Sequence, residues 1–404
     1  GAAALWDSAM ALITGPSAAD LMLSDRVFRH LPLIDLDVVT IGRKVDYWRK
    51  WWEHQTNDEY WQQFVHRPEK VNVPIFQQGG WFDPYSGSHL RSFAGIGDRV
   101  PNRVLMGPWS HEEEIDTFKA DVDLAPALTV IREHDLAFYD RFLKDAGNGW
   151  DDRPPLELYV LGANEWRAES EWPIAGTEPT PWYLHSNGRA NTMSGDGTLS
   201  LDTPASGEPS DRFDYDPEDP VPTIGGNNSV LTMTQGAQTP ILPGPRDQRV
   251  LERRDDVLCY TSEALNHDLE MIGPIEMVLY AASSAIDTDF IVRLSDVYPN
   301  GKAIFLAEGM LRARYRNSVA GESVEMLEPN EVAEFRIRCY PAANVFKRGH
   351  RLRLDVTSSS FPRFSRNLNT GEDVGTGTRM EVAHQTVLHT SAYPSHIVLP
   401  IIRR

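Results

Sequence analysis

Two short apolar runs, separated by a stretch with a different period, organise the first third of the chain. The runs 71–76 and 103–106 are rich in Val, Ile, Leu, Phe and Met, and each ends at glycine within a few residues. Between them, Leu90, Phe93, Ala94 and Ile96 recur at roughly helical spacing. The pattern predicts a strand, a helix and a second strand, and this connection makes the two strands parallel.

An acidic residue follows the first predicted strand, and a histidine follows the second: Asp83 and His111. In an open parallel sheet, functional residues gather beyond the carboxyl ends of the strands. An acid followed by a histidine in this order is the second half of an α/β-hydrolase Ser–Asp–His triad, in which the histidine is the general base and the aspartate orients it. The spacing alone leaves open that His111 is a loop histidine and Asp83 a turn residue before Pro84.

Residues 1–70 combine helical and irregular patterns, and two segments carry aromatic side chains at spacings of three and four. Such spacing places the aromatics on one face of each helix. One interpretation is a small helical layer that packs on the rest of the protein, and the other is a lid whose aromatics line an active site. Segment 46–53 holds Tyr47, Trp48, Trp51 and Trp52, and segment 58–64 holds Tyr60, Trp61 and Phe64.

A further helix is predicted over 126–144, and the glycine pair at 147 and 149 ends it. Two strands and two helices cannot cover both faces of a parallel sheet, and one edge strand would lack a neighbour. The region 71–150 is therefore predicted to be the C-terminal part of a larger sheet.

From residue 154 onward, proline and glycine turns recur, and short strand-like runs replace the helices. Many short strands with regular turns predict an all-β sandwich of the jelly-roll kind over 151–404. The segment 201–250 is rich in Pro, Gly, Asp and Asn, so we expect a long excursion with little regular structure. The predicted strands are 156–161, 180–184, 277–282, 290–297, 303–315, 331–338, 351–357 and 395–399.

The composition describes an ordinary globular chain with an acidic excess. It has 404 residues, 41% of them hydrophobic and 24% charged, and a formal net charge of −19. This charge argues against nucleic acid or an anionic membrane as a partner, and no apolar run approaches the about 18 residues of a membrane helix. Neither Cys259 nor Cys339 has metal-ligand spacing. We therefore expect no metal or cofactor, and a cytoplasmic location with secretion left open.

No Gly-x-Ser-x-Gly pentapeptide occurs in the sequence, and the chain opens abruptly in helix-forming residues. A triad built on Asp83 and His111 therefore needs a serine from elsewhere. We expect the nucleophile to lie on an N-terminal segment, or on a separate chain, that this sequence does not include.

Several separated motifs resemble the bacterial cocaine esterase family. That family sits in a wider group with X-prolyl dipeptidyl peptidases, glutaryl cephalosporin acylases and α-amino-acid ester hydrolases. The resemblance covers essentially the whole chain, and the motifs occur in the same order. The most specific motifs are Gly80-Trp81-Phe82-Asp83, Gly107-Pro108-Trp109-Ser110-His111, and the segments 215–222, 254–258, 287–290, 358–364, 369–371 and 394–400.

The resemblance implies three domains: an α/β-hydrolase domain, whose C-terminal part is 71–150; a helical cap inserted in it, to which the segment 1–70 belongs; and a C-terminal jelly roll over 151–404. It implies that Asp83 and His111 are the catalytic acid and base. It also implies that the serine and an oxyanion-hole tyrosine lie on the N-terminal part. The partners it implies are that part and a small-molecule ester.

The residues after Asp83 bear on the substrate class. The α-amino-acid ester hydrolases of this group carry acids just after the catalytic aspartate, which hold the substrate ammonium. Here a proline, Tyr85 and a serine follow it. The resemblance therefore implies an apolar or aromatic acyl group, with Tyr85 beside the scissile bond and Trp81 as an alternative wall residue. By analogy, Val230 and Leu231 also belong to the substrate pocket.

Other functions remain open at this point. An X-prolyl dipeptidyl peptidase or a cephalosporin-acylase-type amide hydrolase would use the same triad, and a jelly-roll binding module would need no catalysis. A glycosidase would pair Asp83 with a carboxylate of 112–114, a run better explained as a solvated turn. The alternating Arg312, Arg314 and Arg316 are interpreted as surface charges or local pairs on one strand face, which could also face another copy in a homodimer.

Overall fold

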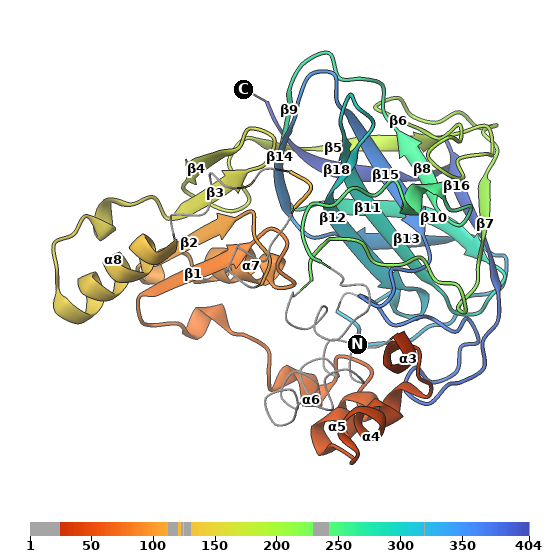
Figure 1. The fold of residues 1–404 in the computed structure, drawn as a ribbon, viewed down its shortest axis with the longest axis horizontal. Helices are drawn as coiled ribbons and strands as arrows, with labels where there is room; N and C mark the ends of the chain where they lie inside the picture. The colour runs from red at the N-terminus through yellow and green to blue at the C-terminus, as the bar shows by residue number, and fades with distance from the viewer. Residues whose placement is uncertain are drawn as a thin grey trace.

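The computed structural model describes residues 25–111, 120–122, 124, 131–228, 242–318 and 320–403. These residues form a group of short helices, a four-stranded sheet with two helices, and a large β-sandwich (Figure 1). In Figure 1 the small sheet lies beside the sandwich, and the short helices lie below the sandwich. Within the described part of the chain, no helix is long and apolar enough to cross a bilayer.

The four-stranded sheet contains the two strands that the hydrophobic pattern predicts. Its elements are β1 (Ile75–Gly80), α7 (Ser86–Ile96), β2 (Asn102–Gly107), α8 (Ile131–Lys144), β3 (Leu156–Val160) and β4 (Glu165–Glu169). β1 and β2 pair in parallel with Gly80 opposite Gly107. Between them, α7 buries Leu90, Phe93 and Ile96 of the predicted face, whereas Ala94 is exposed. The predicted parallel strand–helix–strand unit is confirmed.

Strand β3 joins this sheet, whereas the sequence pattern assigned 156–161 to the sandwich. It pairs in parallel with β2, and β4 follows it in antiparallel. The consecutive residues Leu158 and Tyr159 are both fully buried, as is typical of a parallel strand that is covered on both faces. The amide of Leu161 then donates to the carbonyl oxygen of Ala343 at 3.0 Å. The sheet thus continues past the domain boundary that we expected.

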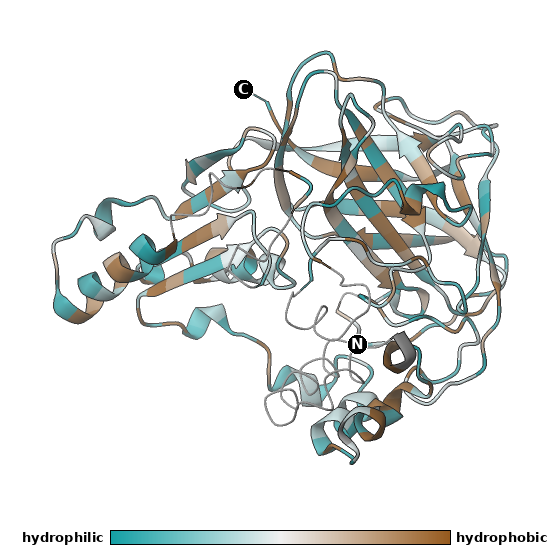
Figure 2. Ribbon diagram, in the orientation of Figure 1, coloured by the Kyte–Doolittle hydropathy of each residue, from teal (hydrophilic) through white to brown (hydrophobic). Residues whose placement is uncertain are grey.

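The remaining strands build the β-sandwich that the sequence predicts, and Figure 2 shows apolar residues along the strands of both sheets. They are β5 (Thr177–His185), β6 (Thr198–Ser200), β7 (Asp211–Tyr215), β8 (Leu258–Thr261), β9 (Leu269–Gly273), β10 (Glu276–Ser283), β11 (Asp289–Val297), β12 (Ala303–Arg312), β13 (Ala333–Arg338), β14 (Ala342–Phe346), β15 (Arg351–Thr357), β16 (Ala383–Thr390), β17 (Tyr393–Pro394) and β18 (His396–Ile402). The main path runs β12-β11-β15-β8-β6-β5-β18-β10-β16-β17, and the other four strands attach at its sides.

One apolar core runs through both sheets. A single buried cluster contains Trp81, Phe82 and Leu158 of the small-sheet region together with Phe305 and Leu354 of the sandwich. The rings of Phe82 and Phe305 lie 6.3 Å apart between centroids. Because burial of apolar area is the main favourable term in folding, the two sheets stabilise each other.

The short helices form a layer with a core of its own. They are α3 (Asp25–Phe28), α4 (Leu36–Ile41), α5 (Asp46–Glu53) and α6 (Glu59–Gln62). α5 has the predicted bounds, and α6 is shorter than predicted. The buried residues of this layer are Val27, Leu33, Leu36, Val45 and Trp48.

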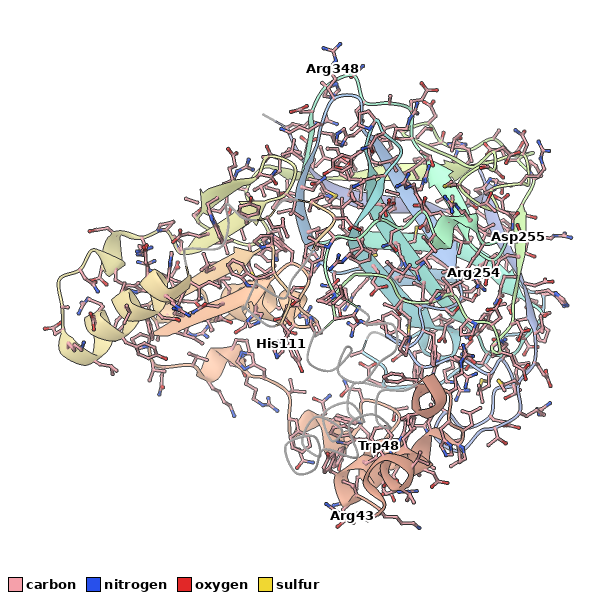
Figure 3. The ribbon with its side chains drawn as sticks, in the orientation of Figure 1. Arg43, Trp48, His111, Arg254, Asp255 and Arg348 are labelled. Atoms are coloured by element: carbon pink, nitrogen blue, oxygen red, sulfur yellow. The ribbon has the colours of Figure 1, made fainter. Side chains whose placement is uncertain are left out.

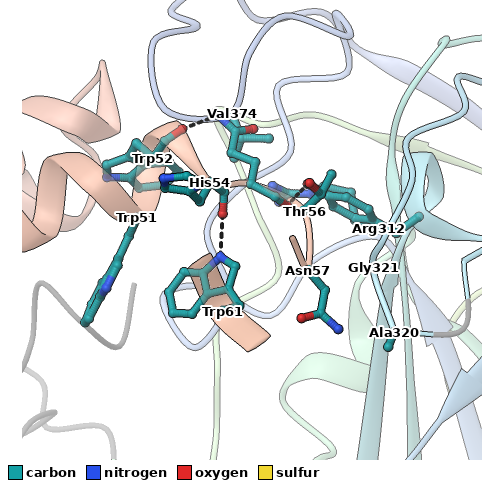
Figure 4. Close-up of a pocket in the computed structure, with 12 residues that line it drawn as sticks. Trp51, Trp52, His54, Thr56, Asn57, Trp61, Arg312, Ala320, Gly321 and Val374 are labelled. Carbon is teal, nitrogen blue, oxygen red and sulfur yellow. Dashed lines mark hydrogen bonds between the residues drawn. The ribbon is translucent and has the colours of Figure 1, made fainter. Parts of the chain in front are cut away.

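The aromatic face of α5 and α6 borders a cavity of about 400 Å³ against the sandwich (Figure 4). Trp51, Trp52 and Trp61 line one side, and Arg312 and Tyr315 line the other. The residues that line this cavity include none from β1, β2 or the turns after them. Trp51, Trp52 and Trp61 thus lie between the helical layer and the sandwich, as in the first interpretation, whereas Tyr47 and Phe64 are exposed.

The predicted arginine stripe does not form. Strand β12 ends at Arg312, and a 3-10 turn replaces the alternating geometry. Arg312 donates to both carboxylate oxygens of Asp289 at 2.9 Å, and Arg314 donates to Asp287 at 2.8 Å. Both arginines are buried. Each arginine therefore forms a local ion pair within the sandwich rather than a surface charge. The pairing is needed because burial of an unpaired guanidinium is costly.

A buried histidine joins β16 to β7. His389 Nε2 lies 2.9 Å from Asp211 Oδ2, and its Nδ1 lies 3.3 Å from Glu208 Oε2. The hydroxyls of Ser186 and Tyr260 also donate to Asp211 Oδ2, at 2.7 and 2.8 Å. Burial alone would lower the pKa of His389, but the hydrogen bonds and charges of the two carboxylates outweigh it and raise that pKa above its ordinary value.

This raised pKa predicts a pH-dependent stability. The stabilisation is fully present below the unfolded histidine pKa of about 6.5, and it is lost as the pH rises through the higher folded pKa. We expect the wild-type Tm to fall between about pH 6 and about pH 9 more steeply than the Tm of His389→Gln, which has no charge to lose. Scanning calorimetry across this range tests the expectation, and parallel Tm curves for the two proteins would contradict it.

Candidate active site

Backbone hydrogen bonds tie together the turns that follow β1 and β2. The amide of Trp81 donates to the carbonyl oxygen of Gly107 at 2.8 Å, and the amide of Phe82 donates to the carbonyl oxygen of Trp109 at 3.1 Å. These bonds continue the pairing past both strand ends. The residues that follow are therefore brought to the same edge of the sheet.

Two glycines permit this close approach. A Cβ atom on Gly80 would lie 1.9 Å from the carbonyl oxygen of Trp109, and one on Gly107 would lie 2.1 Å from the Trp109 ring. Trp109 is itself only 1% exposed and cannot move aside into solvent. Sterics thus explain why glycine occupies these positions in the two motifs, because any side chain there would force the turns apart.

Asp83 and His111 meet where the sequence places them. Asp83 Oδ2 lies 3.2 Å from His111 Nδ1, and the amide of Tyr85 donates to Asp83 Oδ1 at 2.7 Å. The Asp83 side chain is 7% exposed, whereas that of His111, labelled in Figure 3, is 46% exposed. One carboxylate oxygen is therefore fixed by the backbone, and the other faces an imidazole that opens toward solvent.

A cavity of about 410 Å³ lies in front of this pair, lined by Asp83, His111, Tyr85, His89 and the β1 residues Gln77 to Gly79 among others. Within the described residues β1 has a strand partner on one edge only, and the cavity borders β1. Burial lowers the pKa of His89, and the charge of Asp83 only partly offsets this. His89, which the sequence did not single out, thus favours the neutral form beside the pair.

The other predicted site residues separate into three cases. Tyr85 is 49% exposed, and its ring lies edge-on to the His111 ring at 5.4 Å between centroids. Trp81 is a core residue rather than a cavity wall, because it is 1% exposed and its Nε1 donates to the carbonyl oxygen of a buried β3 tyrosine at 2.7 Å. Val230 and Leu231 lie outside the described residues.

Asn227 of the sandwich reaches the Asp83 turn and was not expected. Its Nδ2 donates to the carbonyl oxygens of Trp81 at 2.7 Å and Asp83 at 3.1 Å. The contact joins positions 144 residues apart. No local pattern in the sequence marks such a pair, and the asparagine lies in a segment predicted to be an irregular excursion.

The arrangement is suited to proton transfer. With Nδ1 facing Asp83, the His111 ring presents its Nε2 away from the carboxylate, and a group that approaches there can give it a proton. A carboxylate in the position of Asp83 can stabilise an imidazolium. The carboxylates of 112–114, which a glycosidase would need, lie outside the described residues.

A parallel sheet with an acid and a histidine at the ends of consecutive strands, joined to a β-sandwich, defines a chain of the α/β-hydrolase class. The model of the X-Pro dipeptidyl-peptidase C-terminal non-catalytic domain matches residues 148–398, and the model of X-Pro dipeptidyl-peptidases of the S15 family matches residues 5–113. The chain belongs to this family. The family that the sequence motifs predicted is therefore confirmed.

Named relatives agree with this assignment. Cocaine esterase of Rhodococcus sp. (strain MB1 Bresler) is 39% identical over 361 residues, which are 87% of this chain and 61% of that protein. The solved aminopeptidase of a marine sediment archaeon, Thaumarchaeota archaeon, is 27% identical with a TM-score of 0.74, over 89% of this chain and 60% of its own. A solved α-amino acid ester hydrolase has the same fold, with a TM-score of 0.78 at 24% identity over 93% and 63%. The chain thus spans about three fifths of the length of these relatives.

The steric role of Gly80 can be tested by one methyl group. We expect Gly80→Ala to destabilise the chain by about 1–3 kcal/mol, because the new Cβ must displace the Trp109 carbonyl. Gly147→Ala is the matched control, since a Cβ there meets nothing within 4 Å. Urea denaturation measures both variants, and equal stability of the two would contradict the steric explanation.

Proposed function

We propose that this chain supplies the catalytic acid and base of a serine hydrolase that cleaves carboxylic esters. The observation that carries the proposal is the 3.2 Å contact between Asp83 Oδ2 and His111 Nδ1 at the ends of parallel strands. A buried, oriented carboxylate beside an accessible imidazole is the arrangement that a general base requires. Membership of the family and 39% identity to a cocaine esterase support the same chemistry.

In the proposed reaction, a serine hydroxyl attacks the ester carbonyl while His111 Nε2 takes its proton. Collapse of the tetrahedral intermediate expels the alcohol, which receives that proton, and leaves an acyl-enzyme. Water, deprotonated by the same imidazole, then releases the acid and restores the serine. Asp83 holds the ring in the tautomer that leaves Nε2 unprotonated.

The serine is proposed to lie on a segment outside this sequence. Two observations support this: the 404 residues contain no Gly-x-Ser-x-Gly elbow, and the chain spans 61% of the length of cocaine esterase. Among the described strands, β1 pairs with β2 alone, and such a segment would add to the sheet at the other edge of β1, beside the cavity. The segment and the ester are the partners that the proposal names.

The proposed substrate has an apolar or aromatic acyl group. Tyr85 borders the cavity next to His111 and offers an aromatic wall. Among the described lining residues Asp83 is the only carboxylate, and it faces His111. A buried substrate ammonium needs a carboxylate partner, so neither an amino-acid ester nor a peptide with a free amino terminus is favoured.

Removal of either member of the pair tests the assignment. In this chain joined to the segment that bears the serine, we expect His111→Ala and Asp83→Ala each to lower kcat for ester hydrolysis by about 10³–10⁴-fold, because the serine loses its oriented base. His384→Ala, at an exposed position of the sandwich, is the matched control. Near-native activity of His111→Ala would end the proposal.

Substitution of Tyr85 tests the acyl preference. We expect Tyr85→Ala to lower the ratio of kcat/KM for a benzoyl ester to that for an acetyl ester by about 2–10-fold, the size of one aromatic pair contact. Tyr85→Phe keeps the ring and should keep the ratio. An unchanged ratio in Tyr85→Ala would show that the acyl group binds elsewhere.

A further inference from the structure

A loop of the sandwich hydrogen-bonds to the turn that carries Asp83. Asn227 is fully buried, and its side-chain amide donates to two carbonyl oxygens of that turn, at 2.7 Å to Trp81 and 3.1 Å to Asp83. One amide nitrogen has two hydrogens, and both are used. The two carbonyls lie on either side of the Phe82–Asp83 dipeptide, so this short piece of backbone is held at both ends.

The loop that presents Asn227 is itself fixed. Gly226 and Gly244 exchange two backbone hydrogen bonds, each 2.9 Å long. Gly226 has a φ of +81°, and a Cβ there would meet the Phe305 ring at 3.2 Å. The neighbouring Asn228 closes the loop on itself, because its Nδ2 donates to the Gly225 carbonyl at 2.5 Å. Asn227 therefore projects from a rigid base.

Other hydrogen bonds also restrain the turn that carries Asp83. The amide of Asp83 donates to the Gly80 carbonyl at 3.1 Å, and the amide of Ser86 donates to the Asp83 carbonyl at 3.1 Å. These bonds close the turn locally. The amides of Trp81 and Phe82 tie the turn to the one after β2, and the Asn227 bonds tie it to the sandwich, where Phe82 packs on Phe305.

We propose that Asn227 is a positioning residue that aims the Asp83 carboxylate at His111, so that the β-sandwich takes part in catalysis through a main-chain clamp. This inference rests on the proposed function, in which Asp83 orients the base. Asn227 is not among the residues that line the cavity in front of Asp83 and His111. It acts by keeping the backbone on both sides of Phe82 in one conformation, which preserves the 3.2 Å contact between Asp83 and His111.

Amide hydrogen exchange in the chain as it stands tests the clamp without any activity. The Tyr85 amide, which donates to Asp83 Oδ1, reports the order of the turn. We expect Asn227→Ala to speed its exchange at least about tenfold, while amides of β11 keep their wild-type rates. Asn191→Ala is the matched control, because the Asn191 side-chain amide also donates to two main-chain carbonyl oxygens, those of Arg212 and Asp255, neither of which belongs to the Asp83 turn. Equal Tyr85 exchange in wild type and Asn227→Ala would overturn the inference.

A double-mutant cycle tests the consequence for catalysis, in this chain joined to the segment that bears the serine. We expect Asn227→Ala to lower kcat about 10- to 100-fold with KM nearly unchanged. A catalytic group that is displaced by about 1 Å from its productive position can lose about this much rate. In an Asp83→Asn background the same change should lower kcat less than about threefold, because the carboxylate it serves is gone. A drop of equal size in both backgrounds would show a general structural role and reject the inference.

The two experiments separate this inference from the proposed function. Near-native activity of His111→Ala would refute the proposed function, and the Tyr85 exchange result would still decide whether Asn227 holds the Asp83 turn. If His111 is essential and the cycle shows equal drops, the proposed function stands and the positioning role fails.

Discussion

The close contact between the turns after β1 and β2 is the constraint on which the candidate site depends. Gly80 and Gly107 leave room for the Trp109 backbone and ring, and the two turns are then joined by main-chain hydrogen bonds. Only with the turns in contact do the side chains of Asp83 and His111 reach one another. The site therefore requires glycine at positions 80 and 107 as well as the functional side chains of Asp83 and His111.

The sandwich and the small sheet behave as one packed body. Their apolar residues belong to a single buried cluster, and β3 leads directly from the parallel sheet into a backbone contact with β14. The family model that matches this region describes it as a non-catalytic domain. This domain contributes none of the proposed catalytic side chains. It nevertheless contacts the candidate site directly, because Asn227 hydrogen-bonds to the turn that carries Asp83.

The elements that the sequence predicted best are those with a strong local period. α5 and the β1–α7–β2 unit follow from the spacing of their apolar residues, which decides helix or strand within one segment. β3 was assigned to the wrong sheet because the sequence of a short buried strand does not reveal which of two adjacent sheets it joins. The sequence left open whether Arg312 is a surface charge or a local pair, since a charge pattern does not reveal whether a partner such as Asp289 will cover it.

By itself, the sequence determined the chemistry: a carboxylate and an imidazole after consecutive strands, a tyrosine next to the acid, and the family to which the chain belongs. The tertiary structure decided which neighbours have access to that chemistry. It placed Trp81 in the core, Tyr85 on the cavity, and Asn227 against a turn 144 residues earlier in the chain. Residue type and order fix what a group can do, whereas burial and long-range contact arise only when distant segments pack together.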